Sequence, residues 1–389
     1  MNPAGRALAL ATKMGVDHAE AFYAKLEERV VKVEAWEVRE AWTGIKEGLA
    51  VRAVYRGGLG VAYASPPSER GVEEAVKEAV AQARLKAPRG QGLKDFPGPS
   101  PPPNVEGLLD AELAELGLDQ ASSMLNEGLR GVDVAPRPST INAALTLTRR
   151  LVKIENTLGV DVEFAEALAR LDVEAVAEVH QGRASGFKPV AARRLSDLDV
   201  AKAASEAALE AVRGLRAVKV GCFEAPVVLT GLALRTVVAS LASALDAELI
   251  QLGRSFMSGL PRLSAKLTLI DDPTLPRGAR SRPFDAEGVA SRRLVVIEDG
   301  RVASLLHNHY TASRQGCAST GHAARDGGFN YSGRVSIAPS NVLVAPKGRG
   351  GVEELAAEVG RGLVLCSTYD RPNLASGDFS AVVVSGYLI

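Results

Sequence analysis

The sequence predicts an α+β protein with a mixed α/β N-terminal region in two parts and a strand-rich C-terminal domain. Helical patterns flank runs of alternating apolar and polar residues instead of separating single strands, which is typical of α+β folds. A cluster of prolines divides the N-terminal region. The 389 residues also exceed what one core usually accommodates, so several units are expected.

The first expected unit covers residues 1–86. Its patterns predict, in order, a helix at 3–14, strands at 19–25 and 29–37, a strand–turn–strand segment at 47–63 and a helix at 71–85. Gly57 and Gly58 lie at the centre of the strand–turn–strand segment, and both can adopt the positive φ of a tight hairpin turn. The last helix has an apolar face, because Val72, Val76 and Val80 follow a four-residue spacing.

A semi-rigid linker is expected at 87–105, where prolines at 97, 99, 101, 102 and 103 favour an extended backbone. The second unit is expected at 106–220. Its patterns predict a helix at 110–128, strands at 140–148, 152–155 and 162–180, and a helix at 198–213.

The third unit, the strand-rich C-terminal domain, is expected at 221–389. It opens with a strand at 225–229, and Thr230 is a suitable N-cap for the helix that follows. That helix carries its apolar stripe on Leu234, Val238, Leu241 and Leu245. The remaining patterns predict strands at 267–270, 294–298, 302–307, 341–344 and 380–389, and one helix at 352–361.

Composition narrows the class of protein. Lys and Arg together equal Asp and Glu at 46 each, and this neutrality argues against a nucleic-acid partner, which usually needs a basic surface. No apolar run approaches the roughly 20 residues of a membrane span, and the first 14 residues lack the apolar core of a signal peptide. Three widely spaced cysteines favour a reducing cytoplasm. Asn and Gln total only 15, which is typical of thermophiles.

The histidines exclude a zinc-protease helix within this chain. Such a helix needs two His at i and i+4, with a Glu beside the first as general base. The five histidines at 18, 180, 307, 309 and 322 contain no such pair. A metal site built from His307, His309 and His322 is a weaker alternative, since the first two would share one face of a strand. The simpler interpretation is a polar strand face and a loop histidine.

Two carboxylate clusters and one polar loop are candidates for substrate contact. Asp285 and Glu287 lie in Phe-Asp-Ala-Glu-Gly, and Asp271-Asp272-Pro273 precedes them. These groups have the chemistry of acid–base catalysis or cation binding, but capped turns explain them as simply. The candidate substrate-binding residues are Asn341, Asn373, Gly377, Asp378, Phe379, Ser380, Asp285 and Glu287. No catalytic residue is assigned.

These motifs resemble the TldD/PmbA family, also called modulators of DNA gyrase. The resemblance rests on Glu-Gly-Leu-Ala-Val-Arg at 47–52 with Gly-Val-Ala-Tyr at 60–63, Asp271-Asp272-Pro273, 284–288, Ser319-Thr320-Gly321, Asn341 and 373–380. The motifs occur in the family's order over almost the whole chain. The family implies two branches: TldD-type subunits bind zinc through His-Glu-x-x-x-His on the helix that opens the C-terminal domain, and PmbA-type (TldE-type) subunits lack this motif.

The helix expected at 231–245 has no His and no Glu, so the chain resembles the PmbA branch. The resemblance implies a subunit of a heterodimeric metallopeptidase that degrades or trims peptides, with zinc on a TldD-type partner and no cofactor on this chain. Whether the chain has activity of its own is left open. The alternatives are a non-catalytic homodimer that binds peptides or proteins, a gyrase-modulating regulator acting through protein contacts, and an independent metallopeptidase using the three histidines.

Overall fold

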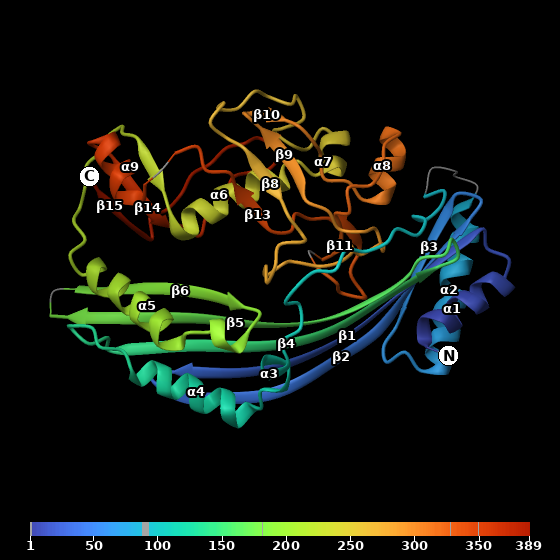
Figure 1. Cartoon of the computed structure of the whole chain (residues 1–389), viewed down its shortest axis with the longest axis horizontal. Coiled ribbons are helices and arrows are strands. Elements are labelled where there is room, and N and C mark those ends of the chain that lie inside the picture. Colours follow the sequence, from blue (N-terminus) through green and yellow to red (C-terminus); the bar gives the residue numbers. More distant parts are fainter. Residues whose placement is uncertain (1, 88–92, 181, 327, 349) are drawn as a thin grey trace.

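The structure is a computed structural model that describes residues 2–87, 93–180, 182–326, 328–348 and 350–389. A long, curved antiparallel sheet runs through the N-terminal region in the order β3-β2-β1-β4-β5-β6 (Figure 1). Its strands are β1 (His18–Glu34), β2 (Glu37–Tyr55), β3 (Gly58–Ala64), β4 (Thr140–Asn156), β5 (Asp161–Val179) and β6 (Gly182–Ala192). The α+β class predicted from the sequence is confirmed.

The sheet joins the two parts expected at 1–86 and 106–220. Strand β1 pairs with β4 continuously from Glu20 opposite Asn156 to Val33 opposite Ala143. The strand breaks expected near residues 26–28 and 149–151 are wrong, because pairing on both sides keeps β1 and β4 extended through them. The chain reverses instead at Ala35 and Trp36, which both have positive φ.

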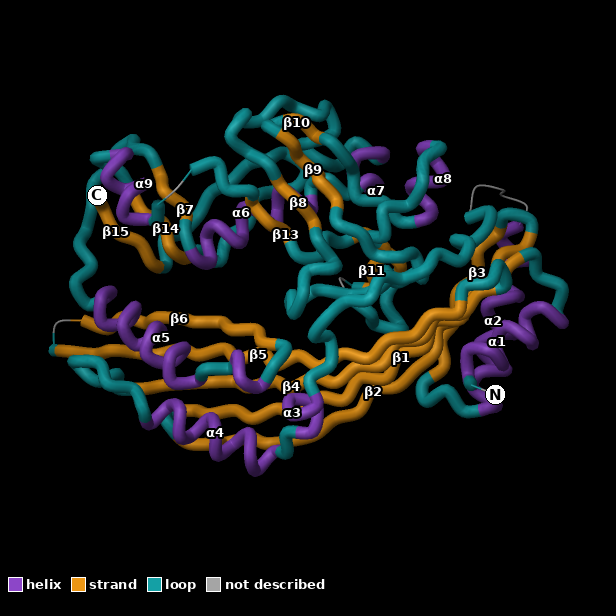
Figure 2. The backbone as a smooth tube through the Cα atoms, viewed as in Figure 1, coloured by secondary structure: helices purple, strands orange, loops and turns teal. Residues whose placement is uncertain are grey.

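In the described part of the chain, helices cover the convex face of the sheet in two groups (Figure 2). One group packs over the end of the sheet that contains β3, and the other packs over the opposite end of the strands, from β2 and β1 through β4 to β5 and β6. The first comprises α1 (Pro3–Lys13) and α2 (Glu69–Lys86), and the second α3 (Ala111–Glu115), α4 (Leu118–Arg130) and α5 (Val200–Gly214). The predicted apolar face of α2 is confirmed, since Val72, Val76 and Val80 are all buried. Each group therefore closes a separate core.

The hairpin between β2 and β3 uses its glycines differently from the expectation. Positive φ falls on Arg56 (46°) and Gly57 (77°), not on Gly58. Gly58 lies against α2, where an added Cβ would be 2.2 Å from the Ala83 carbonyl oxygen. The sequence pattern correctly placed the turn, but Gly58 serves the close approach of helix and strand instead of the turn itself.

The C-terminal region combines short strands and helices in three small sheets, of order β10-β9-β8-β13, β11-β12 and β15-β14-β7. Its elements are β7 (Val227–Leu229), α6 (Gly231–Ser243), α7 (Ala247–Gln251), β8 (Leu269–Asp271), β9 (Leu294–Glu298), β10 (Arg301–Val302), α8 (His309–Gln315), β11 (Ala323–Arg325), β12 (Val335–Ile337), β13 (Val342–Val344), α9 (Val352–Val359), β14 (Leu363–Ser367) and β15 (Ser385–Leu388). The helix predicted after Thr230 is present as α6. The strand predicted at 302–307 is wrong beyond Val302.

Aromatic side chains of the C-terminal region pack against aromatic side chains on the concave face of the sheet. The Phe164 ring of β5 meets the ring of Phe284 edge to face at 5.1 Å and that of Phe329 at 5.3 Å. Phe22 of β1 lies in the same cluster. The contact places the loops of the C-terminal region directly over polar residues of β1 and β2.

The proline-rich segment bridges the same two layers. Residues 88–92 of the expected linker lie outside the described residues. Residues 93–105 contain neither helix nor strand, and the Pro97 carbonyl accepts a hydrogen bond from Asn156 Nδ2 at 2.8 Å. Ser100 Oγ accepts another from the Ala290 backbone N–H at 2.9 Å. Among the helices of the described residues, none is long and apolar enough to cross a membrane.

Candidate functional site

Four charged side chains form a buried network between the sheet and the C-terminal region. Glu20 of β1 and Arg52 of β2 lie opposite each other in register, on the face turned away from α1 and α2. Arg52 donates from Nε and Nη2 to both Glu20 oxygens, at 2.9 and 2.6 Å. Arg52 Nη2 also donates to Glu287 Oε1 at 2.9 Å, and Arg325 Nη2 donates to Glu20 Oε1 at 3.0 Å. The C-terminal region thus completes an ion cluster that begins in the sheet.

Burial and neighbouring charges shift the pKa values of Arg52 and Arg325 in opposite directions. Burial lowers the pKa of Arg52, but the carboxylates of Glu20 and Glu287 outweigh it and hold the pKa above its usual value. Burial lowers the pKa of Arg325 to about 10, because Glu20 compensates it only in part and Arg52 repels it. Arg325 is therefore the less compensated of the two buried cations.

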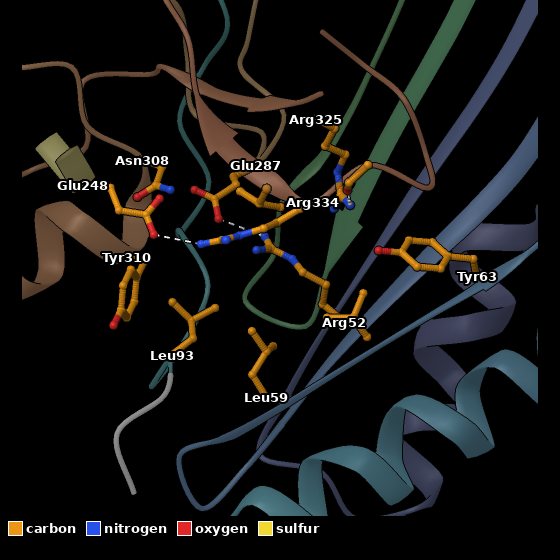
Figure 3. A pocket seen from close by; sticks show the side chains of 13 residues that line it. Arg52, Leu59, Tyr63, Leu93, Glu248, Glu287, Asn308, Tyr310, Arg325 and Arg334 are labelled. Atoms are coloured by element: carbon orange, nitrogen blue, oxygen red, sulfur yellow. Dashed lines mark hydrogen bonds and ion pairs between the residues drawn. The ribbon is translucent and has the colours of Figure 1, made fainter. Parts of the chain in front are cut away.

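A cavity of about 380 Å³ opens beside this network (Figure 3). Its lining residues come from the β2–β3 hairpin, the segment after the undescribed residues 88–92, and the C-terminal region: Arg52, Leu59, Val61, Tyr63, Leu93, Glu248, Glu287, Asn308, Tyr310, Arg325, Gly333, Arg334 and Val335. Arg334 Nη2 lies 2.8 Å from Glu248 Oε1 across the cavity. Apolar walls with a few charged groups are typical of small-molecule and peptide sites.

Glu287 and Asp285, both predicted as candidate site residues, have different environments. Glu287 lines the cavity, and its Oε2 accepts a hydrogen bond from the His309 backbone N–H at 2.8 Å. Asp285 does not line it. The Asp285 carboxylate accepts backbone N–H groups of Glu287, Val289 and Ala323 at 2.9–3.0 Å. Burial and the Glu287 charge raise the pKa of Asp285 to about 7. Asp285 therefore anchors the loop that presents Glu287.

The other predicted residues are not brought to the cavity. Asn341 uses its amide within neighbouring loops: Nδ2 donates to the Asp272 carbonyl and to Ser281 Oγ, and Oδ1 accepts from the Arg280 N–H. In the segment from Asn373 through Gly377, Asp378 and Phe379 to Ser380, the Asn373 side chain accepts two backbone N–H groups, and Gly377 has a φ of 78°. A substrate-binding role for these residues stays a prediction.

The histidines do not gather into one metal site. His309 begins helix α8, so the expected strand that would present it beside His307 is wrong. His307 Nδ1 lies 3.1 Å from Thr311 Oγ1, His309 Nε2 lies 2.7 Å from Asp95 Oδ1, and His322 Nε2 lies 3.0 Å from Asp271 Oδ1. Within the described ranges, no three His, Cys, Asp or Glu side chains are arranged to hold a metal ion. Each imidazole has a structural partner instead.

Sequence reasoning missed Glu20, Arg52 and Arg325. A usable signal was present for the first two, because a charged residue interrupts an apolar strand pattern in Ala19-Glu20-Ala21-Phe22 and in Ala50-Val51-Arg52-Ala53. Charges buried within sheets require partners. Glu20 and Arg52 pair with each other, and their further partners Glu287 and Arg325 lie more than 200 positions away in the chain, which no local pattern contains.

The fold and the matched domains define a protein of a metallopeptidase family. Residues 19–83 match the family model described as PmbA/TldA metallopeptidase domain 1, and residues 223–389 match the PmbA/TldA metallopeptidase C-terminal domain. The chain therefore belongs to the PmbA/TldD family, as the sequence motifs predicted.

Relatives and solved structures agree over nearly the whole chain. A protein named metalloprotease PmbA homolog from Haemophilus influenzae is 25% identical over 388 residues, covering 96% of this chain and 81% of its own. An uncharacterized protein of Methanocaldococcus jannaschii is 24% identical over 375 residues, covering 95% and 84%. The crystal structure of TldE from Thermococcus kodakarensis shares the fold with a TM-score of 0.88, at 23% identity, covering 98% of this chain and 86% of that one.

Proposed function

We propose that this chain is the non-metal, PmbA/TldE-type subunit of a two-subunit metallopeptidase that degrades or trims peptides. A TldD-type partner would bring zinc and the general base, and this chain would complete the peptide-binding surface. The observation that carries the proposal is helix α6, which opens the C-terminal region and contains no His, Cys, Asp or Glu. Leu234, Arg235 and Ala239 are exposed on it instead. The family membership and the likeness to TldE support the same assignment.

Peptide substrates suit this surface for a physical reason. An extended peptide satisfies its backbone by strand addition, which is independent of sequence and needs no large charge on the protein. The chain has zero formal net charge and many short strands in its C-terminal region. A cytoplasmic location and a heterodimeric assembly belong to the same proposal.

The test is co-expression with a TldD-type chain that carries His-Glu-x-x-x-His. We expect a stable heterodimer on size-exclusion chromatography, zinc in the complex, and hydrolysis of an unstructured peptide by the complex but by neither chain alone. A partner with its motif Glu replaced by Gln is the control, because it should assemble without cleaving. Lack of association, together with unchanged partner activity, would refute the proposal. A homodimer that binds peptides without cutting them would favour the non-catalytic alternative.

A further inference from the structure

The cavity beside the ion network contains guanidinium groups with unused hydrogen-bond donors. Arg52 donates from Nε and Nη2, and among the described residues its Nη1 has no partner. Arg325 donates from Nη2 to Glu20 and from Nη1 to the Gly333 carbonyl at 3.5 Å, but its Nε is buried without any acceptor in the described part of the chain. Buried polar groups are normally paired, so the buried Arg325 Nε calls for an acceptor that the described residues do not supply.

The positions of the carboxylates leave Arg325 as the guanidinium group best placed to bind an added anion. Both Glu20 oxygens and Glu287 Oε1 are bound to Arg52, so Arg325 only shares one Glu20 oxygen. Glu248, the other carboxylate of the lining, pairs with Arg334. Burial and the nearby positive charge of Arg52 both disfavour the charged form of Arg325. An anion bound beside Arg325 would stabilise that charged form. A planar carboxylate matches guanidinium geometry best.

The walls indicate what kind of carboxylate fits. Leu59, Val61, Leu93 and Val335 provide an apolar surface, and Figure 3 shows the Tyr63 ring directed toward the two guanidinium groups. The volume of about 380 Å³ suits a few amino-acid residues. A C-terminal residue of a peptide carries an α-carboxylate and a side chain on the same carbon, so it can meet both surfaces at once.

We propose that this cavity binds the C-terminal α-carboxylate of a short peptide, with Arg325 and Arg52 as donors and the apolar wall against the last side chain. The choice of a peptide rests on the proposed function. The cavity would hold one end of a peptide whose remaining residues extend over the complex. It is a binding site, and no covalent step is assigned to it.

Calorimetry on the full chain alone tests the ligand. The probes are acetyl-Ala-Ala-Leu with a free carboxylate, the same peptide amidated, and N-acetyl-leucine. We expect the free acid to bind at least about tenfold more tightly than the amide, since charge-assisted hydrogen bonds are lost on amidation. Equal affinity of acid and amide, or absence of binding at millimolar peptide, would overturn the site. N-acetyl-leucine binding as tightly as the tripeptide would overturn the peptide assignment.

Variants locate the binding in the cavity. Val61→Trp fills the apolar wall and should abolish binding, while Arg325→Lys keeps the charge, loses the planar fork and should weaken binding about tenfold. Arg334→Gln should weaken it about threefold, because it removes a cation of the cavity lining and leaves the Glu248 carboxylate there without its partner. Arg70→Gln is the matched control, because Arg70 and Arg334 have 88% and 80% exposed side chains and one Glu partner each.

The folded state of each variant is checked by its thermal transition. If Arg325→Lys unfolds, Val61→Trp and Arg334→Gln still decide the question. Unchanged affinity in Val61→Trp, or equal effects of Arg334→Gln and Arg70→Gln, would refute the site. Val61→Trp should still associate with a TldD-type partner, so a failed cavity and a failed heterodimer are distinguishable.

Discussion

Arg52 of strand β2 lies 2.9 Å from Glu287 of the C-terminal region, measured from Nη2 to Oε1. The two residues are 235 positions apart in the chain, and both are buried. Arg52 also holds Glu20 of the neighbouring strand, and its guanidinium stacks over the Phe96 ring at 4.9 Å. One side chain therefore ties the sheet, the proline-rich segment and the C-terminal region together.

Arg52→Met should lower the free energy of unfolding by about 3–5 kcal/mol, because it leaves buried carboxylates without their cation. Urea denaturation at neutral pH measures the change. Arg170→Met is the control: its side chain is 67% exposed beside Asp172, so the loss should stay within about 0.5 kcal/mol. Equal stability of the two variants would show that the buried network contributes little.

Asp285→Asn should destabilise the protein by about 1–3 kcal/mol, because an amide cannot accept all three backbone N–H groups that the carboxylate accepts. Asp378→Asn, in an exposed loop where Asp378 accepts from Ser376 Oγ, should change the unfolding free energy by at most about 0.5 kcal/mol. Chemical denaturation of both variants tests the anchoring role of Asp285. A stable Asp285→Asn protein would contradict it.

Asp246 gives the stability a defined pH dependence. Burial raises the pKa of Asp246 to about 6, above the roughly 3.9 of an unfolded chain. The folded state then binds more protons than the unfolded state between about pH 4 and 6, so this group stabilises the fold at low pH and loses that contribution as pH rises through 6.

Asp246→Asn removes this titration while keeping an oxygen for the Glu248 and Leu249 N–H groups. As pH rises from 4 to 7, we expect the free energy of unfolding of the variant to increase by about 1 kcal/mol relative to that of the natural protein, after allowance for solvent screening. Urea midpoints across this range measure the difference, and the two proteins should be nearly equal at about pH 4. A difference that does not vary with pH would refute the assignment.

Gly60 of β3 allows α2 to pack closely on the sheet. A Cβ at this position would lie 1.8 Å from the Ala79 carbonyl oxygen and 2.6 Å from the Ala83 nitrogen, both of the α2 backbone. Gly60→Ala should therefore cost about 3 kcal/mol, as overpacking does. Gly98→Ala, where a Cβ meets nothing within 4 Å, should change stability by less than about 0.5 kcal/mol. Thermal and urea unfolding of the pair tests this contrast.

Local sequence patterns determined much of the fold. The valine spacing of α2, the turn at Gly57 and the helix after Thr230 were all predictable, because helix faces and tight turns depend on residues within one or two turns of each other. The motifs also determined the family. The absence of a His pair in the sequence was equally readable, since that motif needs a fixed spacing on one helix.

Only the tertiary structure decided which strands pair and which charges meet. The joining of β1 to β4 across more than 100 residues, the partners of Arg52 and the cavity beside Arg325 all arise where distant segments pack. Alternation shows that a strand has a buried face, but it does not name the neighbouring strand, because any strand with the same period satisfies it equally. The charges of Glu20 and Arg52 are visible in the sequence. Their role in a buried ion network depends on the C-terminal loop, which places Glu287 within hydrogen-bond distance of Arg52.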